Sequence, residues 1–312
     1  MAVETPTRFG VRLPGLRRLR AGRARAELPR LEVQDRLWNL ALSLPMTLFL
    51  IVFFVLPFAF IFLYAFGLYD ANYKPTGQVS LSNFSDVWTW STAVLFGRTA
   101  FVAGMVTLLC FVFAYPAAYF IAEQPRRRRE LLVMLLIIPF WTSFLLRTYS
   151  LMTIFGENGL ANQALELLGL SRDPVFRIRN VWAVIWAETY TFMPFMVLPL
   201  YASLERMNRA AIEASYILGA GRVQTFFRVI LPLSVPGILA GSLLVFIIAM
   251  GELVIPSLVG GIEAQYLLGN EIFARAGQLP GSASALGMIF MAVVLAISIL
   301  YVRVVGRGGL RL

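Results

Sequence analysis

Six long apolar blocks constrain the fold of this chain more than any other feature of its sequence. A helix needs roughly 20 consecutive, mostly apolar residues to cross the hydrocarbon core of a bilayer. The blocks reach that length, and only 14% of the residues are charged, against roughly 25% in an average soluble domain. We therefore predict an all-α membrane protein with six transmembrane helices and disfavour a soluble all-helical protein. The predicted spans are Leu44–Phe66, Val94–Ala122, Leu131–Phe155, Val181–Leu204, Gly237–Val259 and Ala285–Val305.

The basic residues predict how these spans are oriented. Of the 27 Lys and Arg residues, 20 lie in the tail before Leu37, Glu123–Glu130, Glu205–Pro236 and Arg303–Leu312. Cytoplasmic loops carry an excess of Lys and Arg, so we expect both termini to be cytoplasmic. This distribution also accounts for the net charge of +10 without a nucleic-acid partner.

The same distribution divides the chain into a basic cytoplasmic tail, residues 1–36, and a transmembrane domain, residues 37–312. The tail either lies against anionic lipid or is a disordered arm that only fixes the topology, and we favour the second interpretation.

Missing residue types exclude several kinds of chemistry. The chain has no histidine and one cysteine, Cys110, so it has no disulfide within the chain, no Cys/His zinc site and no catalytic triad with histidine. It also lacks the Gly-x-x-x-x-Gly-Lys-Ser/Thr phosphate loop. We predict that the chain is not an enzyme and binds no cofactor or metal of its own.

Residues 205–236, between the fourth and fifth predicted spans, form the most informative polar segment. Ala210–Leu218 favours a short amphipathic helix. Gly219 and Gly221 suit a helix stop, because glycine accepts a left-handed conformation without steric cost. A helix, a sharp turn and a returning segment have the shape of a docking element; the alternative is a plain helical connection.

The order of residues in this loop resembles the EAA loop of permeases of binding-protein-dependent ABC importers. That pattern reads Glu-Ala-Ala, three residues, Gly, nine residues, then Ile-x-Leu-Pro. Ser215 replaces the second alanine, and Val229 replaces the isoleucine. The resemblance implies that the helix of the loop inserts into a groove on a separate ATPase and couples ATP-driven closure to pore opening. The positions in register are Glu213, Ala214, Gly219, Leu231 and Pro232.

Other segments resemble the spermidine/putrescine (polyamine) permease branch, with coverage from about Trp38 to the end of the chain. They are Thr148–Gly159, Pro194–Tyr201, Gly241–Phe246 and Gly251–Gly261. Leu253 stands where that branch has an aromatic residue. The resemblance implies import of putrescine or spermidine. Because relatives move other small organic cations and amino compounds, another small amine or an amino acid is the alternative.

The resemblance also implies the fold of the chain, its location and its partners. The fold would be that of a type I ABC importer permease with a cytoplasmic coupling helix, in a bacterial inner membrane. The partners would be a second homologous permease, two copies of a cytoplasmic ABC ATPase that holds ATP and Mg, and a periplasmic substrate-binding protein. The rival is a self-sufficient secondary carrier or channel. A carrier is expected to contain inverted repeats, and we find no internal repeat in the sequence.

Three ionisable residues stand out within the predicted spans, in the outer half of the membrane: Arg147, Glu188 and Glu252. Such groups are costly in a bilayer and usually face a cavity or one another. Carboxylates and aromatic faces suit an alkylammonium substrate, so we predict that the two glutamates line its passage with Arg147 as a restraining partner. The alternative is a structural salt bridge from Arg147 to a glutamate, with the aromatics as an interfacial belt. These aromatic residues are Trp141, Tyr149, Trp182, Trp186 and Tyr190.

Two further patterns carry local predictions. The spacing Gly237–Gly241 lets two helices approach closely, either within the subunit or at a contact with a second permease. The loop Glu157–Leu170 predicts a short amphipathic helix that meets the binding protein or caps the bundle.

Overall fold

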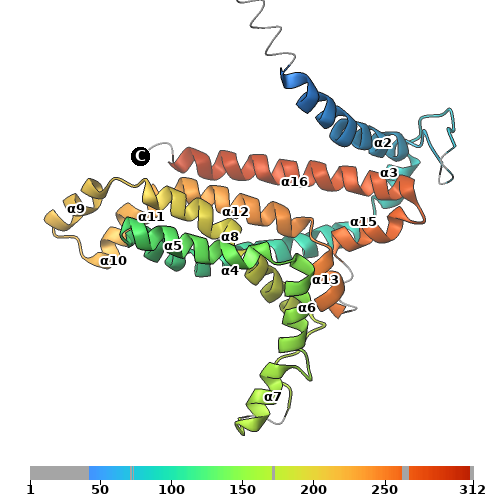
Figure 1. Cartoon of the computed structure of the whole chain (residues 1–312). Coiled ribbons are helices and arrows are strands. Elements are labelled where there is room, and N and C mark those ends of the chain that lie inside the picture. Colours follow the sequence, from blue (N-terminus) through green and yellow to red (C-terminus); the bar gives the residue numbers. More distant parts are fainter. Residues whose placement is uncertain (1–41, 71, 73, 171–172, 262–266, 310–312) are drawn as a thin grey trace, which may run out of the picture. The chain divides into compact units, whose positions relative to one another are not determined.

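The computed structural model describes residues 42–70, 72, 74–170, 173–261 and 267–309, which are predominantly helical (Figure 1). The predicted basic tail, residues 1–36, lies outside the described residues. Within the described part, four helices are long and apolar enough to cross a membrane, or up to six if each of two bent pairs is one span. The four are Leu42–Ala65, Trp90–Glu123 (α4), Val181–Glu205 (α8) and Pro280–Arg303, which belongs to α16 (Pro280–Gly309).

The chain divides into two units, residues 1–60 and 61–312. In the first unit, the described residues 42–60 are helical, with a π-helical turn at Ile51–Val55 (η1) followed by the start of α2 (Leu56–Ala65). Their large apolar side chains are exposed, Phe53 by 67% and Phe54 by 68%. A helix that is apolar all round belongs in a protein core or in a membrane, so this exposure suits a lipid-facing span.

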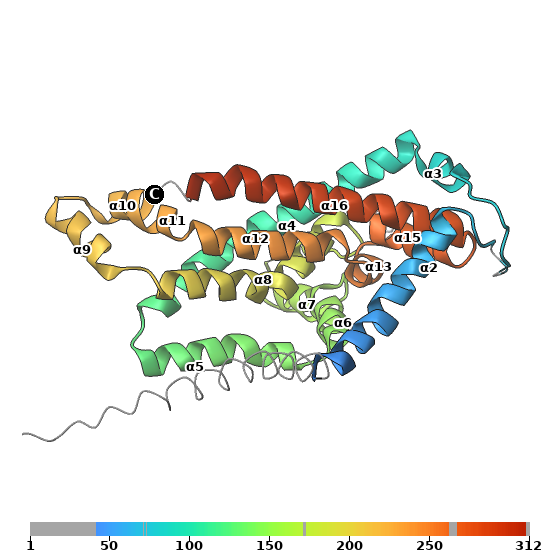
Figure 2. The ribbon, with the colours of Figure 1, turned by 90° about the horizontal axis from the view of Figure 1, so that it is seen from above.

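The core of the second unit is a bundle of α4, α8 and α12 (Val235–Met250), which pack against one another. Figures 1 and 2 show these helices side by side with α16 along α12. Cys110 and Val106 on α4, Met196 and Leu200 on α8, and Val245 on α12 are fully buried there. The short helices α3 (Ser82–Val87) and α15 (Leu268–Ala276) pack against α16.

Two glycines let α12 approach α8 closely. A Cβ on Gly237 would lie 2.5 Å from Ser203 Cβ and 2.7 Å from the Pro199 carbonyl oxygen. A Cβ on Gly241 would lie 2.7 Å from Met196 Sδ. These distances are shorter than any van der Waals contact, so both positions need glycine at this crossing. The predicted close approach therefore occurs within the subunit.

The third predicted span, Leu131–Phe155, was wrong as a single helix. The chain forms α5 (Arg126–Ile137), a 3₁₀ turn at Ile138–Trp141 (η2) and α6 (Phe144–Phe155). The segments Arg126–Trp141 and Phe144–Leu167 are bent by 88° at the break between them. Pro139 has no amide proton and its ring clashes with the preceding turn, and Thr142 Oγ1 donates to the Pro139 carbonyl at 2.6 Å. The depth of Arg147 therefore cannot be measured along one straight span.

The fifth predicted span, Gly237–Val259, was too long at its end. Helix α12 stops at Met250, and a separate helix α13 (Val254–Val259) follows. Between them, Glu252 Oε1 accepts hydrogen bonds from the amides of Val254 at 2.8 Å and Ile255 at 3.2 Å. At the other end, α12 follows the bent segment Arg222–Leu233 at 64°.

Candidate functional site

The loop between α8 and α12 contains the predicted helix, α9 (Arg209–Ile217), which extends beyond the ends of both helices (Figures 1 and 2). The Asn208 side chain begins it by accepting a hydrogen bond from the Ala210 amide at 3.0 Å. Glu213 and Ala214 are exposed on α9. Within the described part of the chain, Glu213 has no hydrogen bond or ion pair, so its carboxylate is free to meet a partner.

The turn after α9 confirms one of the two predicted glycine positions. Gly219 has φ of +84°, and its amide bonds to the Tyr216 carbonyl at 3.0 Å. Gly221 instead has φ of −72° and precedes α10 (Arg222–Thr225), so the prediction of a left-handed residue there was wrong. The single left-handed residue is enough to reverse the chain.

We expect Gly219→Val to destabilise this turn by about 1–2 kcal/mol, because an L-residue with a Cβ is strained in the left-handed region. Gly219→Asn is the matched control, since asparagine tolerates that conformation and a Cβ there meets nothing within 4 Å. Hydrogen exchange of the amides in residues 209–220 measures the effect. Equal protection in the two variants would contradict this account of the turn.

The returning segment fastens α9 to the bundle. It runs through a π-helical turn, Phe226–Ile230 (η3), and α11 (Leu231–Leu233). Ser215 Oγ lies 2.9 Å from Thr225 Oγ1, so the serine that replaces the usual alanine joins α9 to α10. The predicted coupling residues Leu231 and Pro232 are half-buried in α11. They position the loop at the entry to α12 instead of presenting a surface.

Aromatic rings hold η3 against α4. The Phe226 ring meets the rings of Tyr115 and Tyr119 edge to face, with centroids 5.5 Å and 6.5 Å away. The Tyr115 hydroxyl also lies 2.9 Å from Ser234 Oγ at the start of α12. This contact set connects the returning segment to the core, and the sequence pattern did not reveal it.

The tip of the loop is apolar and exposed. Large apolar side chains that stay exposed on one surface mark a site for a partner. The exposed fractions are 86% for Ile217 and Leu218, 71% for Val223 and 60% for Phe227. We call these apolar residues, together with the exposed Glu213, the α9 tip; Glu213 also lines a cavity between α9 and the bundle.

A cavity of about 390 Å³ lies between α9 and the ends of α4 and α8. Its wall includes Tyr119 and Glu123 from α4, Glu205 from α8, and Ile212 and Tyr216 from α9. The face of α9 that looks toward the bundle is therefore incompletely packed.

The charged residues of the predicted passage lie in different surroundings. Glu188 is fully buried in the face of α8 that belongs to the core, and neither of its oxygens has a hydrogen-bond partner in the described residues. The Glu252 carboxylate accepts from the amides of Val254 and Ile255 at the start of α13. Arg147 lies with its guanidinium carbon 4.5 Å from the centre of the Phe140 ring. Among the described residues Arg147 has no ion pair, so the predicted alternative of an Arg147–glutamate salt bridge was wrong.

The aromatic candidates separate into two groups. Trp186 and Tyr190 line a cavity of about 630 Å³ on α8, together with Trp182, Phe155, Phe176 and Arg177. Trp141 and Tyr149 do not line it and are exposed by 80% and 52%. Glu188 is two residues from both Trp186 and Tyr190, about 200° around a helix. The aromatic cavity and the buried carboxylate therefore lie on opposite sides of α8.

The loop at residues 157–170 folds as predicted into the short helix α7 (Leu160–Leu167). Buried Asn162 secures it, donating to the carbonyls of Gly156 at 2.9 Å and Phe176 at 2.7 Å and accepting from the Phe176 amide at 2.9 Å. Leu160 and Leu167 remain exposed by 60% and 88%. A rigid, partly apolar surface thus extends from α6.

Comparisons with known proteins find relatives whose descriptions agree with one another. Residues 114–307 match the family described as the binding-protein-dependent transport system inner membrane component. The chain is 43% identical over 171 residues to the spermidine/putrescine transport system permease protein PotB of Escherichia coli, covering 55% of this chain and 62% of that protein. The chain thus spans less than two thirds of that relative. It is 33% identical over 250 residues to PotB of Haemophilus influenzae, covering 79% and 87% of the two chains.

A solved structure shares the fold. The crystal structure of a bacterial ABC transporter involved in the import of the acidic polysaccharide alginate contains a chain with a TM-score of 0.69 and 20% identity. The match covers 90% of this chain and 99% of that one. The family match covers more than half of the sequence, and it includes the loop that carries α9. The chain therefore belongs to the family of inner-membrane components of binding-protein-dependent transport systems.

Proposed function

We propose that this chain is a permease subunit of an ATP-driven importer that carries putrescine, spermidine or a related small organic cation across a bacterial inner membrane. The observation that carries the proposal is the α9 tip: an exposed helix with an unpartnered Glu213, an apolar end and a glycine-dependent turn. Such a surface suits a groove on a separate ATPase. The chain supplies the passage, and the ATPase holds ATP and Mg.

The proposed complex contains a second, homologous permease, two copies of the ATPase and a periplasmic binding protein. Both termini and the α9 tip face the cytoplasm, in agreement with the distribution of Lys and Arg. Helix α7 then lies on the periplasmic side, where its exposed leucines suit contact with the binding protein. A related solved transporter is described as bound to its periplasmic protein, which supports an arrangement of this kind.

Movement passes from α9 to the bundle through contacts at both ends of the loop. Only three residues, 206–208, separate α8 from α9. On the other side, the Ser215–Thr225 contact and the Phe226 ring join α9 to α4 and α12. When ATP-driven closure displaces α9, these attachments tilt the helices of the bundle and alternate the access of the passage.

The substrate assignment rests on the relatives named for spermidine and putrescine and on two carboxylates in the bundle. Glu188 and Glu252 place two carboxyl groups in the bundle, which suits an alkylammonium group. Trp186 and Tyr190 offer aromatic faces on the other side of α8. Fold alone does not fix the substrate, since the alginate transporter has the same fold.

The first test is uptake of labelled putrescine and spermidine by cells that lack their own systems and carry this subunit with the partners encoded beside it. ATP-dependent accumulation supports the proposal. If the complex assembles and hydrolyses ATP but neither amine enters, the importer remains and the substrate is another small amine or an amino acid. If the subunit never co-purifies with an ATPase, the proposal is refuted.

We expect Glu252→Gln to lower uptake about tenfold, because a hydrogen bond to a charged group contributes roughly 1.5–3 kcal/mol. The glutamine oxygen still accepts from the amides of Val254 and Ile255, so α13 and assembly of the complex remain intact. Asp86→Asn, which removes one negative charge from an exposed residue of α3, is the control. Unchanged uptake would remove Glu252 from the passage.

A further inference from the structure

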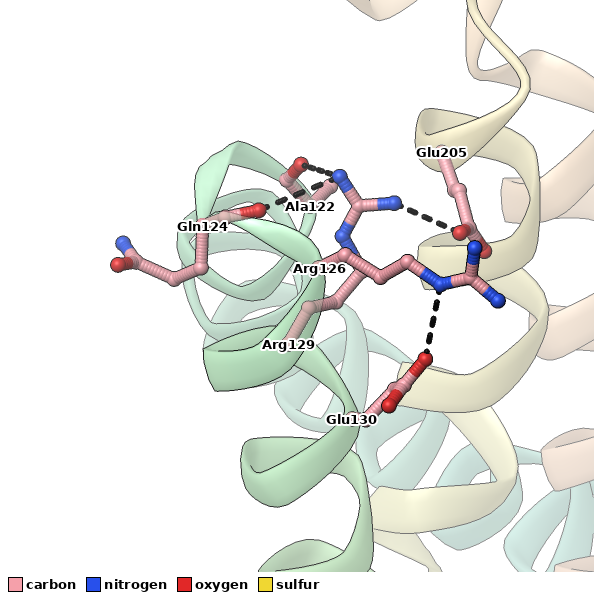
Figure 3. A network of polar contacts seen from close by, with 6 residues as sticks. All are labelled: Ala122, Gln124, Arg126, Arg129, Glu130 and Glu205. Atoms are coloured by element: carbon pink, nitrogen blue, oxygen red, sulfur yellow. Dashed lines mark hydrogen bonds and ion pairs between the residues drawn. The ribbon is translucent and has the colours of Figure 1, made fainter.

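A single arginine joins three helices beside the root of α9, by which we mean residues 205–208, from the end of α8 to the start of α9. Arg129, on α5, donates from one guanidinium nitrogen to Glu205 Oε1 at 2.7 Å. A second nitrogen donates to the carbonyls of Ala122 and Gln124, each at 3.2 Å (Figure 3). Glu205 is the last residue of α8, and Ala122 and Gln124 lie at the end of α4. The guanidinium therefore connects α4, α5 and α8.

These contacts are more sheltered from solvent than those of an ordinary surface ion pair. The side chain of Arg129 is only 16% exposed and that of Glu205 is 39% exposed. Hydrogen bonds between ionised partners are short and strong, and a cation is favourable at the carboxyl end of a helix, where carbonyls lack partners. The same α5 carries a second ion pair, Arg126–Glu130, which is 91% and 67% exposed and joins only residues of α5 (Figure 3).

The cavity beneath α9 leaves few packing contacts between α9 and the bundle, so the contacts of Arg129 matter for how α9 is held. Because about 390 Å³ between α9 and the ends of α4 and α8 is unfilled, packing alone does not transmit a push on α9 through this side of the loop. Glu205 belongs to the wall of that cavity and stands four residues before α9 begins at Arg209. An unrestrained root would let α9 move into the cavity while the bundle stayed still.

We infer that Arg129 is a positioning residue for coupling, which fixes the root of α9 to α4 and α5 so that displacement of α9 moves the bundle. The inference rests on the proposed function, since it requires an ATPase that displaces α9. The contacts of Arg129 would be a second connection between α9 and the bundle, through α8 and α5, besides the connection through Ser215 and Phe226.

The test uses the complete complex in proteoliposomes, with binding protein and labelled spermidine, and measures amine imported per ATP hydrolysed. Energetic coupling between two sites typically changes affinities 5–150-fold, so we expect Arg129→Gln and Glu205→Ala each to lower this ratio at least about fivefold. Arg126→Gln, which removes the same charge from the same helix, should leave it unchanged. The double variant should be no worse than the worse single variant, because both changes break one contact.

The outcomes separate a coupling role from a structural one. If Arg129 only stabilised the fold, its variants would reduce the amount of assembled complex while the surviving complex imported the normal amount per ATP, and the inference would be overturned. An equal ratio in Arg129→Gln and Arg126→Gln would overturn it as well. Glu205→Ala keeps the test decisive if Arg129→Gln fails to fold. Failure of the wild-type subunit to co-purify with an ATPase would instead refute the proposed function, and the inference with it.

Discussion

Glu213→Arg is expected to reduce polyamine uptake to background, at least about 100-fold, while the subunit still folds. The side chain is exposed on α9 and makes no hydrogen bond or ion pair among the described residues, so its replacement disturbs no packing within the subunit. At an interface, disrupting a buried, hydrogen-bonded charge costs about 2–5 kcal/mol, and a reversed charge adds repulsion. Uptake in cells, together with co-purification of the ATPase, measures the effect.

The control for this variant is Glu130→Arg, the same charge reversal at an exposed glutamate of α5 that does not line the cavity beneath α9. Its uptake should stay near that of the wild type. Normal uptake by Glu213→Arg would show that the α9 tip is not the coupling surface. A loss that appears equally in both variants would point to net charge instead of a specific contact.

Gly237→Ala is expected to destabilise the subunit by about 1–3 kcal/mol, the usual cost of adding a methyl group to a fully packed site. The new Cβ would fall 2.5 Å from Ser203 Cβ and 2.7 Å from the Pro199 carbonyl oxygen, and the second of these is backbone that cannot rotate away. Helices α8 and α12 would have to separate. Thermal unfolding of the purified subunit in detergent or nanodiscs gives the measurement.

The same change at Gly104 in α4 is expected to have the opposite sign. A Cβ there meets nothing within 4 Å, and alanine is favoured over glycine in a helix by about 0.5–1 kcal/mol. Gly104→Ala should therefore unfold at the same or a higher temperature. If both variants lost the same stability, the cause would be a general sensitivity of glycines and not the crossing of α8 and α12.

The loop that carries α9 was predictable from sequence because its determinants are local. The helix-starting Asn208, the left-handed Gly219 and the register of Glu213 act within a few residues of one another. The structure places Gly219 and the helix of Glu213 as the pattern indicated, and it adds the Asn208 cap, which the pattern did not single out. The spans themselves were predictable in position, since apolar content decides which segments enter a bilayer.

The passage was harder to predict because it depends on which way each side chain faces. Equal depth along a helix places Glu188 near Trp186, but an offset of two residues turns them to opposite sides. Arg147 was placed by counting along a span that bends at Thr142. Arg129 was counted only among the basic residues that fix topology, since its bonds to α4 and α8 require those helices to be in place.

The π-helical turn of η3 makes the geometry of this loop depend on its length. In η3, the amide of Leu231 bonds to the carbonyl of Phe226, five residues earlier, so the turn holds one residue more than an α-helical turn. That extra residue falls near the end of the gap between Gly219 and the Leu231–Pro232 pair. A loop one residue shorter would change the phase of α10 against α12 by about 100°. Phe226 would then turn away from Tyr115, and the α9 tip would be rotated relative to a binding partner.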